Sequence, residues 1–317
     1  MDDTIGAVAY NAPMASTSPK IVSPLSLSTG MVIAYCDSIE VSRSTGFLWS
    51  YREEVFLVTN WHCLTGINPF SGKSLSKLGA RPTSVVLALA TSQFGVKYAI
   101  ELPLFDLEGE AVWFVHPTAG EQVDIAAIRV TENILANDQP SPSLARPLNE
   151  FESKRLQAFV GDELMIVGFP RNLHIHGLPL FKRATFATEP VLFEDRPHFR
   201  HESDHRQVWV DCATREGMSG SPVIHVKRSM ILRPYGDTSY DDLLDSYSFY
   251  GIYSGRLLDA EEDPIVNDLF AAQIGIVWPR PLIERVVQNG VRDRFKRADA
   301  FNKTVEIETI PEAGEGA

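Results

Sequence analysis

The first half of the chain contains a series of short runs rich in Val, Ile, Leu, Phe and Tyr, each bounded by Gly, Ser, Asp or Pro. Branched and aromatic residues suit the pleated surface of a strand, and the bounding residues favour turns, so these runs predict β-strands rather than helices. The predicted strands are MVIAYC (31–36), GFLWSY (46–51), EVFLVTN (54–60), SVVLALA (84–90), KYAIELPLF (97–105) and DIAAIRV (124–130).

The same pattern resumes after a proline-rich stretch with little apolar content, NDQPSPSLARPLNE (137–150), which we interpret as a connector. The predicted strands of the second half are DELMIVGFP (162–170), RATFATEPVLF (183–193), RQVWVDC (206–212), SPVIHV (221–226), YSFYGIYSG (247–255) and AAQIGIVW (271–278). Two successive sets of strands, with turn signals between them, favour a pair of small β-barrels over an alternating strand–helix fold.

The end of the chain has a helical pattern instead. The segment PLIERVVQNGVRDRF (281–295) starts with proline and then spaces its apolar residues at a helical period. We therefore divide the chain by the kind of structure that each part predicts. The parts are a flexible N-terminal arm (1–27), a first β-barrel (28–136), a connector (137–155), a second β-barrel (156–280), a C-terminal helix (281–300) and an acidic tail (301–317).

Composition narrows the class of partner. The chain of 317 residues carries 29 basic and 41 acidic side chains, and its formal net charge of −12 opposes binding to nucleic acid or to anionic lipid. No stretch is apolar for long enough to span a membrane, and the N-terminus lacks the basic and apolar regions of a secretion signal. The three cysteines cannot all pair, and their spacing resembles no metal site. These features predict a cytoplasmic protein without a nucleic-acid or membrane partner and without a metal.

Three polar residues at strand ends or in a loop are candidates for catalysis. His62 ends an apolar strand in VTNWHCLTG, Asp124 opens one in GEQVDIAAIRV, and Ser219 lies in the small-residue loop EGMSGSPVI. Each alone is also explained by an ordinary role, as a buried histidine, a turn cap or part of a flexible loop. Together they supply a hydroxyl nucleophile, a base to take its proton and an acid to orient that base. We therefore predict that the three form a catalytic triad for acyl transfer.

Glycines on both sides of Ser219 extend this prediction. Gly217 and Gly220 permit a tight backbone turn that other residues resist. Such a turn directs the amide N–H groups of Gly217 and Ser219 toward one point, where each would stabilise the oxyanion of a tetrahedral intermediate by about 3 kcal/mol.

The segments around these residues resemble those of one peptidase family. LVTNWHC is similar to the histidine signature of trypsin- and chymotrypsin-like serine peptidases, DIAAIRV to their aspartate segment and GMSGSPV to their nucleophile loop, and they occur in that family's order. VGDELMIVGFP and GIYSG also resemble segments of the family, the first of them in its bacterial branch, so the resemblance runs from about residue 30 to about residue 280. It implies an all-β fold of two six-stranded antiparallel β-barrels of the chymotrypsin type, a protein or peptide substrate and no cofactor.

The sequence departs from secreted members of the family in two places. Met218 stands where secreted trypsins carry the aspartate that pairs with a newly cut amino terminus, so activation by that ion pair is not expected. We expect a preformed site, or one switched by loop ordering or by an activating protein partner. Cys63 matches a position that is often bridged in secreted relatives, but the stretch SRSTGFLW, where its partner would lie, has no cysteine. A small buried thiol is expected there, with a redox role as the alternative.

The resemblance also implies the residues that contact substrate. Ala213 is expected near the base of the specificity pocket, and Ser254, Gly255 and Arg256 along its wall. No acid stands at the base, which argues against a preference for Lys or Arg. Arg256 either narrows the pocket or pairs with an acidic side chain of the substrate, which predicts a small or acidic preference; the alternative is an arginine that faces solvent.

The function predicted from the sequence is that of a serine endopeptidase that cleaves intracellular proteins through an acyl-enzyme. His62 would take the proton of Ser219 and later return it to the leaving amine, while Asp124 holds the imidazole. Two other classes stay open: a catalytically silent module that binds a peptide on a peptidase fold, and a serine esterase. The order His, Asp, Ser differs from that of α/β-hydrolases, which disfavours the esterase.

Overall fold

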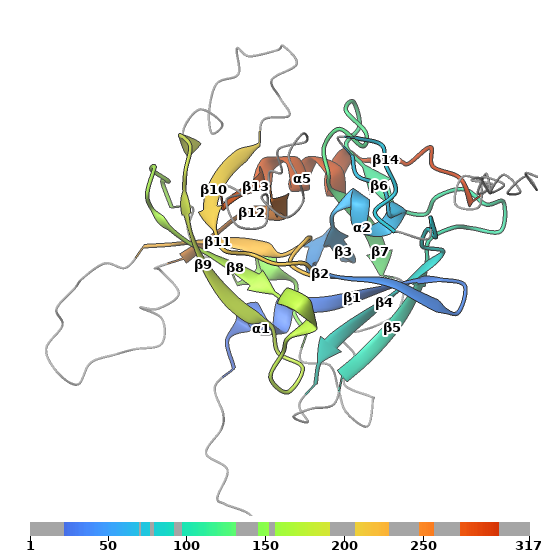
Figure 1. Ribbon diagram of the computed structural model, residues 1–317, viewed down its shortest axis with the longest axis horizontal. Coiled ribbons are helices and arrows are strands. Elements are labelled where there is room, and N and C mark those ends of the chain that lie inside the picture. The colour runs from blue at the N-terminus through green and yellow to red at the C-terminus, as the bar shows by residue number, and fades with distance from the viewer. Residues whose placement is uncertain are drawn as a thin grey trace, which may run out of the picture.

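The computed structural model describes residues 22–69, 71–76, 79–91, 97–130, 145–151, 156–190, 207–227, 247–256 and 273–297, and its strands form two antiparallel sheets (Figure 1). The first sheet has eight strands in the order β14-β6-β7-β3-β2-β1-β4-β5. The second is a closed barrel of six strands in the order β10-β13-β12-β11-β8-β9. The fold is therefore mostly β, and each half of the chain builds one of its two sheets, apart from the late strand β14.

Every run that the sequence predicts as a strand overlaps a strand of the structure. The strands are β1 (Thr29–Cys36), β2 (Ile39–Tyr51), β3 (Glu54–Thr59), β4 (Ser84–Ala90), β5 (Lys97–Pro103), β6 (Phe114–Val115), β7 (Ala126–Val130), β8 (Glu163–Gly168), β9 (Leu180–Phe186), β10 (Val208–Cys212), β11 (Pro222–Val226), β12 (Tyr247–Arg256), β13 (Ile274–Pro279) and β14 (Val291–Arg292). Helices are short and few among the described residues: α1 (Pro24–Ser28), α2 (Trp61–Thr65), α5 (Arg280–Asn289) and the 3-10 turns η1 (Leu148–Glu150) and η2 (Pro170–Asn172). No described helix has both the length and the apolar character needed to cross a membrane.

The prediction of two closed six-stranded barrels is confirmed for the second half of the chain and corrected for the first. The first sheet has eight strands, and its edge strands β14 and β5 do not pair with each other among the described residues. The extra strands are the very short β6 and β14, which pair Val115 with Val291. Because these partners lie far apart in the sequence and are only two residues long, no local pattern predicts them.

The C-terminal helix is shorter than predicted. It ends at Asn289 rather than at residue 300, because the backbone becomes extended at Gly290, with φ −60° and ψ 152°, and the chain then enters β14 at Val291. The helical spacing of apolar residues continues past this point in the sequence, but pairing with β6 replaces the helix there. The predicted tail (301–317) lies outside the described residues.

The chain after β14 is hydrogen-bonded to α2, the helix that carries His62. The carboxylate of Asp293 accepts hydrogen bonds from the indole N–H groups of Trp61 and Trp113, at 2.5 and 2.8 Å. Trp61 is the first residue of α2, so this contact links the C-terminal segment to the position of His62.

The predicted arm and connector are only partly described. Residues 1–21, 131–144 and 152–155 lie outside the described residues. The end of the predicted arm is not a loose segment, because it forms α1 and buries Leu25 in the core. Within the connector, the side chain of Asn149 accepts a bond from the N–H of Ser50 and donates one to its carbonyl, at 2.9 and 2.8 Å.

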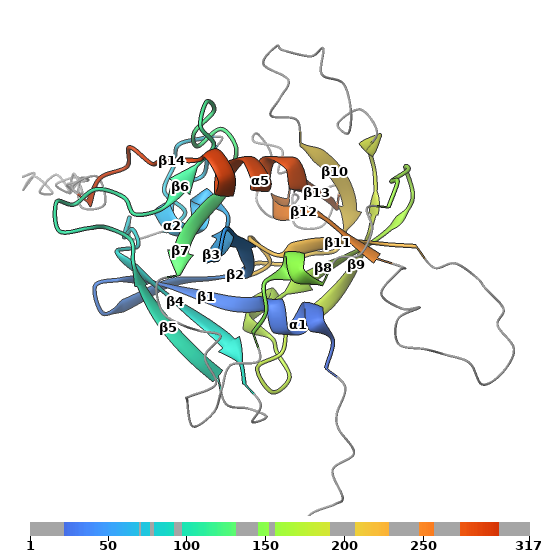
Figure 2. The same cartoon turned by 180° about the vertical axis from the view of Figure 1, so that it is seen from behind.

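Strand alternation in β2 divides the core. Phe47 and Trp49 point into a cluster shared with the barrel, whereas Leu48 between them belongs to a separate cluster of the first sheet. Helix α5 adds Ile283 and Val286 to the shared cluster, and Figure 2 shows it lying across both halves. The two halves thus share a core, which fixes side chains from one half relative to those from the other.

Candidate active site

His62 is positioned by the turn between β3 and α2. The backbone is extended at Asn60 and becomes helical at Trp61, and Gly66 ends the helix in the left-handed region with a bond from its N–H to the His62 carbonyl. The backbone N–H of His62 donates to Asp124 Oδ1 at 3.0 Å, and its ring Nδ1 lies 2.7 Å from Asp124 Oδ2. Two bonds to one carboxylate therefore hold both the backbone and the ring of His62.

Asp124 is fully buried just before β7, and its hydrogen bonds compensate for the burial of its charge. Besides His62, its carboxylate accepts a bond from the hydroxyl of Ser254. Its backbone carbonyl accepts one from the side-chain amide of Asn60 at 2.7 Å. A carboxylate held in this way can fix the tautomer of the imidazole and stabilise its protonated form.

Opposing effects act on the pKa of His62. Burial of the imidazole, of which 15% stays exposed, lowers this pKa, whereas the charge of Asp124 and its hydrogen bond raise it. The neighbouring Cys63 acts in the same direction as Asp124. The raising effects are larger in sum, so the pKa of His62 lies well above the ordinary histidine value of 6.5.

Ser219 lies between two glycines that the local backbone requires. The φ angles are 89° at Gly217 and 84° at Gly220, in the region that side chains resist. A Cβ atom would lie 2.3 Å from the Phe169 carbonyl oxygen at the first position and 1.9 Å from that of Thr45 at the second. Both the conformation and the space therefore demand glycine, as the sequence indicates.

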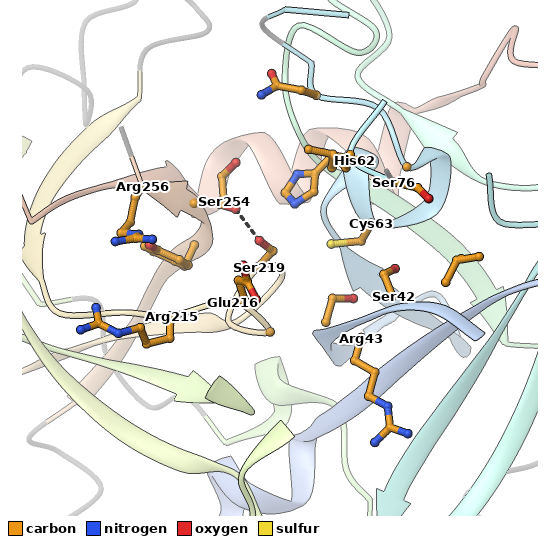
Figure 3. Close-up of a pocket in the computed structure, with 18 of the residues that line it drawn as sticks. Ser42, Arg43, His62, Cys63, Ser76, Arg215, Glu216, Ser219, Ser254 and Arg256 are labelled. Carbon is orange, nitrogen blue, oxygen red and sulfur yellow. Dashed lines mark hydrogen bonds between the residues drawn. The ribbon is translucent and has the colours of Figure 1, made fainter. Parts of the chain in front are cut away.

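The hydroxyl of Ser219 donates to the backbone carbonyl of Ser254 at 2.8 Å (Figure 3). Among the hydrogen bonds of the described residues, none joins Ser219 to His62. Ser254 thus contacts both the candidate nucleophile through its carbonyl and the carboxylate of Asp124 through its hydroxyl. Transfer of the seryl proton to His62 requires the hydroxyl to leave the Ser254 carbonyl.

The peptide before Gly217 is oriented by η2. The N–H of Arg171 donates to the Glu216 carbonyl at 2.7 Å, and the C=O and N–H of a trans peptide point in opposite directions. The N–H of Gly217 therefore points away from Arg171. Neither this amide nor that of Ser219 has a hydrogen-bond partner among the described residues, and both residues line one cleft. The predicted oxyanion donors are thus open to a ligand.

The cleft between the two halves has a volume of about 600 Å³. Ser254, Gly255 and Arg256, which the resemblance implies along the wall of the specificity pocket, line it. The expectation for Ala213 is corrected: this residue is exposed and does not line the cleft, whereas the buried Thr214 does. The alternation of β10, in which Val208, Val210 and Cys212 are buried, continues past its end and places Ala213 on the exposed side and Thr214 on the buried side.

A family model described as a trypsin-like peptidase domain matches residues 44–231, more than half of the chain. The chain belongs to the trypsin-like peptidase family. The matched stretch of this trypsin-like peptidase contains His62, Asp124 and Ser219 and ends before β12, which carries Ser254 and Arg256.

Some solved structures resemble this peptidase at low sequence identity. The active form of the Rv3671c protease from M. tuberculosis is 14% identical, with a TM-score of 0.44, over 85% of this chain and 84% of that one. Its inactive form is 15% identical with a TM-score of 0.44, over 87% of this chain and 98% of that one. A serine endoprotease from Yersinia pestis is 12% identical with a TM-score of 0.44, over 83% of this chain and 62% of that one. A search of curated proteins found no match.

Thr45 joins the loop of Ser219 to β2 through hydrogen bonds that the sequence analysis did not predict. Its hydroxyl donates to the Gly217 carbonyl at 2.7 Å and accepts a bond from the N–H of Phe169 at 3.2 Å. Its backbone N–H donates to the Ser219 carbonyl at 2.8 Å. Thr45 is fully buried and is an ordinary residue in a strand, so only the fold reveals these contacts.

We expect Thr45→Val to lower kcat by about 10-fold to 100-fold with little change in KM. The substitution keeps the shape of the side chain but leaves the buried Gly217 carbonyl and Phe169 N–H without their partner, which loosens the oxyanion donors. Steady-state kinetics with one peptide substrate measure this, and Thr45→Ser, which keeps the hydroxyl, is the matched control. Equal values of kcat for the Val and Ser variants would show that the hydroxyl does not position the loop.

The raised pKa of His62 predicts activity that develops on the alkaline side of 6.5. A general base must be unprotonated, so the rate rises as the pH passes through the pKa of His62. Because this pKa is raised, the rate should rise at a higher pH than it would for an ordinary histidine. Measurement of kcat/KM for an uncharged peptide from about pH 5 to about pH 10 locates this acid limb. A midpoint at or below 6.5 would contradict the assigned pairing of Asp124 with His62.

The remaining predictions for the site concern metal and thiols. Within the part of the chain that the structure describes, no group of three or more His, Cys, Asp or Glu side chains is placed to hold a metal ion. Cys36, Cys63 and Cys212 are free thiols, of which the last two are buried. Cys63 also lines the cleft beside His62, and Met218 is buried in the core of the barrel.

Proposed function

We propose that this trypsin-like peptidase is a serine endopeptidase in which His62, Asp124 and Ser219 form the catalytic triad. One observation carries the proposal: a buried carboxylate holds the His62 ring at 2.7 Å in the same cleft as a serine between two glycines. The open amides of Gly217 and Ser219 support it, because acyl transfer needs donors for a developing oxyanion.

The first half of the proposed reaction forms an acyl-enzyme. The hydroxyl of Ser219 leaves the Ser254 carbonyl, gives its proton to Nε2 of His62 and attacks the scissile carbonyl. The negative charge that develops on the substrate oxygen is stabilised by the two amide donors, and the charge on the imidazolium by Asp124.

The acyl-enzyme is complete when His62 gives its proton to the leaving amine, which departs as the C–N bond breaks. In the second half, His62 takes a proton from water, which attacks the acyl-enzyme, and returns that proton to the oxygen of Ser219 as the ester bond breaks. The leaving amine must therefore lie on the side of Ser219 that His62 occupies.

The silent peptide-binding module remains the rival proposal because of one observation. The Ser219 hydroxyl donates its hydrogen bond to the Ser254 carbonyl at 2.8 Å, and a carbonyl acceptor does not activate the hydroxyl as a nucleophile. In the silent module this bond persists when a peptide binds, whereas in the peptidase the hydroxyl turns to His62.

Hydrolysis assays with the full-length chain separate the candidate functions. We expect internal cleavage of casein that is lost in Ser219→Ala. Hydrolysis of p-nitrophenyl acetate without cleavage of casein would support an esterase instead. Binding of peptides without hydrolysis of either substrate would support the silent module and overturn the proposed endopeptidase.

We also propose that the enzyme acts on intracellular proteins in the cytoplasm and that a protein partner or loop ordering activates it. The three free thiols are typical of a reducing compartment. The resting position of the Ser219 hydroxyl supports a site that is completed by an activating event. The purified chain is then expected to cleave casein at a basal rate that a cell extract raises; a rate that no extract raises would contradict the trigger, and recovery in a secreted fraction would contradict the location.

A further inference from the structure

The charge of the cleft is opposite to that of the whole chain. The chain carries 29 basic and 41 acidic side chains, with a formal net charge of −12. The cleft, in contrast, is lined by four arginines and, among the described residues, by one carboxylate, that of Glu216. The arginines are Arg43, Arg171, Arg215 and Arg256. A cationic cleft in an acidic protein attracts anionic ligands and repels cationic ones.

Among the described residues, three of these guanidinium groups have no carboxylate partner. Arg43 is bound by both carboxylate oxygens of Glu40, at 2.6 and 2.8 Å. No ion pair among the described residues includes Arg171, Arg215 or Arg256. Guanidinium groups stay charged at all physiological pH values and bind carboxylates through two parallel hydrogen bonds. These three are therefore open to a carboxylate of a ligand.

Two of the unpaired arginines lie on the acyl side of the nucleophile. Figure 3 shows Arg215 and Arg256 on one side of Ser219 and His62 on the other. Because His62 must protonate the leaving amine, the acyl part of the substrate occupies the side of the arginines. Arg256 also follows Ser254 by two positions in β12, and the Ser254 carbonyl lies 2.8 Å from the Ser219 hydroxyl.

The cleft wall next to these arginines is neutral and offers hydroxyl groups. The hydroxyls of Thr214 and Tyr253 bond to each other, and both residues are buried and line the cleft. Hydroxyl groups can donate to a carboxylate, whereas among the described residues of the cleft Glu216 is the one acid that could balance the charge of a Lys or Arg side chain. Arg215 is steadied by a bond from its guanidinium to the Thr214 carbonyl at 3.0 Å.

We propose that the cleft selects acidic peptides, with an Asp or Glu side chain immediately before the scissile bond held by Arg215 and Arg256. This specificity rests on the proposed endopeptidase function. It also assigns Arg256 one of the roles that the sequence leaves open, that of a partner for an acidic side chain of the substrate, because this residue lines the cleft.

Cleavage of three matched peptides tests the specificity. In each peptide, the residue directly before the scissile bond is Glu, Gln or Lys, and the residues around the scissile bond are otherwise alanines. We expect the Glu peptide to be cleaved with a kcat/KM at least about tenfold above that of the Gln peptide, and the Lys peptide to be the poorest substrate. A Gln or Lys peptide cleaved as fast as the Glu peptide overturns the proposal.

Variants of Arg215 and Arg256 test whether these two residues cause the preference for Glu. In the double variant Arg215→Gln with Arg256→Gln, the ratio of kcat/KM for the Glu peptide to kcat/KM for the Gln peptide should fall to nearly one. Arg129→Gln is the matched control, because Arg129 pairs with Glu54 on β3, away from the cleft. A preference that survives in the double variant overturns the assignment.

A binding measurement keeps this proposal distinct from the proposed catalysis. Fluorescence anisotropy with the Ser219→Ala chain, which needs no turnover, should show the labelled Glu peptide binding about tenfold more tightly than the Gln peptide. Tighter binding of the Glu peptide by a chain that cleaves nothing would sink the endopeptidase but leave the acidic specificity. Peptide cleavage by the wild type together with equal binding of the Glu and Gln peptides would support the endopeptidase but overturn the acidic specificity.

Discussion

Replacement of Ser219 by alanine is expected to lower kcat for peptide hydrolysis by about a million-fold. The only hydroxyl between Gly217 and Gly220 is lost, so no acyl-enzyme forms, although the amide donors and the cleft stay in place. A residual rate of about 1,000-fold over water can persist from those groups alone. Single-turnover kinetics on a chromogenic peptide, with enzyme in excess, measure a loss of this size.

Ser221 supplies the matched control for this substitution. It lies two residues further along the same loop, and its buried hydroxyl has no hydrogen-bond partner among the described residues. Ser221→Ala should therefore keep kcat within about threefold of the wild type, because no hydrogen bond is broken. Equal losses in the two variants would mean that the loop, and not the hydroxyl of Ser219, is responsible.

Asp124→Asn is expected to lower kcat by about ten-thousand-fold near neutral pH. The amide cannot stabilise the imidazolium of His62, and its NH₂ group favours the wrong tautomer of the ring. Loss of the negative charge also removes the main effect that raises the pKa of His62, so this pKa should fall. Kinetics across the pH range should show a much lower plateau and an acid limb displaced to lower pH.

Ser254→Ala provides the comparison for Asp124→Asn. It removes one hydrogen bond to the carboxylate but keeps the charge and the contact of 2.7 Å with His62. We expect a loss of kcat of about tenfold, in line with one bond to a charged group. If the Asn variant lost no more activity than the Ala variant, Asp124 would not be the acid of the triad.

The sequence predicts most of the strands because their signals are local. The runs around Leu57 and Ile166, for example, combine branched and aromatic residues with turn residues at both ends, and both form strands in the structure. The residues of the candidate site were also predictable, because His62, Asp124 and Ser219 occur in characteristic local contexts. The structure adds that the first two contact each other at 2.7 Å and that the third lies in the same cleft as His62.

The features that the sequence did not predict depend on contacts between distant segments. Thr45 contacts the loop of Ser219 across 172 positions between Thr45 and Gly217, and nothing in the stretch around Thr45 signals this. The end of α5 is set by pairing of Val291 with Val115, which competes with a sequence pattern that still favours a helix. The burial of Thr214 in place of Ala213 is different, because it continues the alternation of β10, a local pattern that the resemblance to distant relatives did not take into account.

The central claim, that His62 activates Ser219 as a nucleophile, is tested most directly by labelling the full-length chain with a fluorophosphonate and locating the adduct by mass spectrometry. We predict one adduct, on Ser219, which is absent in Ser219→Ala, is retained in Ser221→Ala and forms at least about 1,000-fold more slowly in His62→Ala. An adduct on another residue, or labelling of Ser219 at the same rate without His62, would contradict the account.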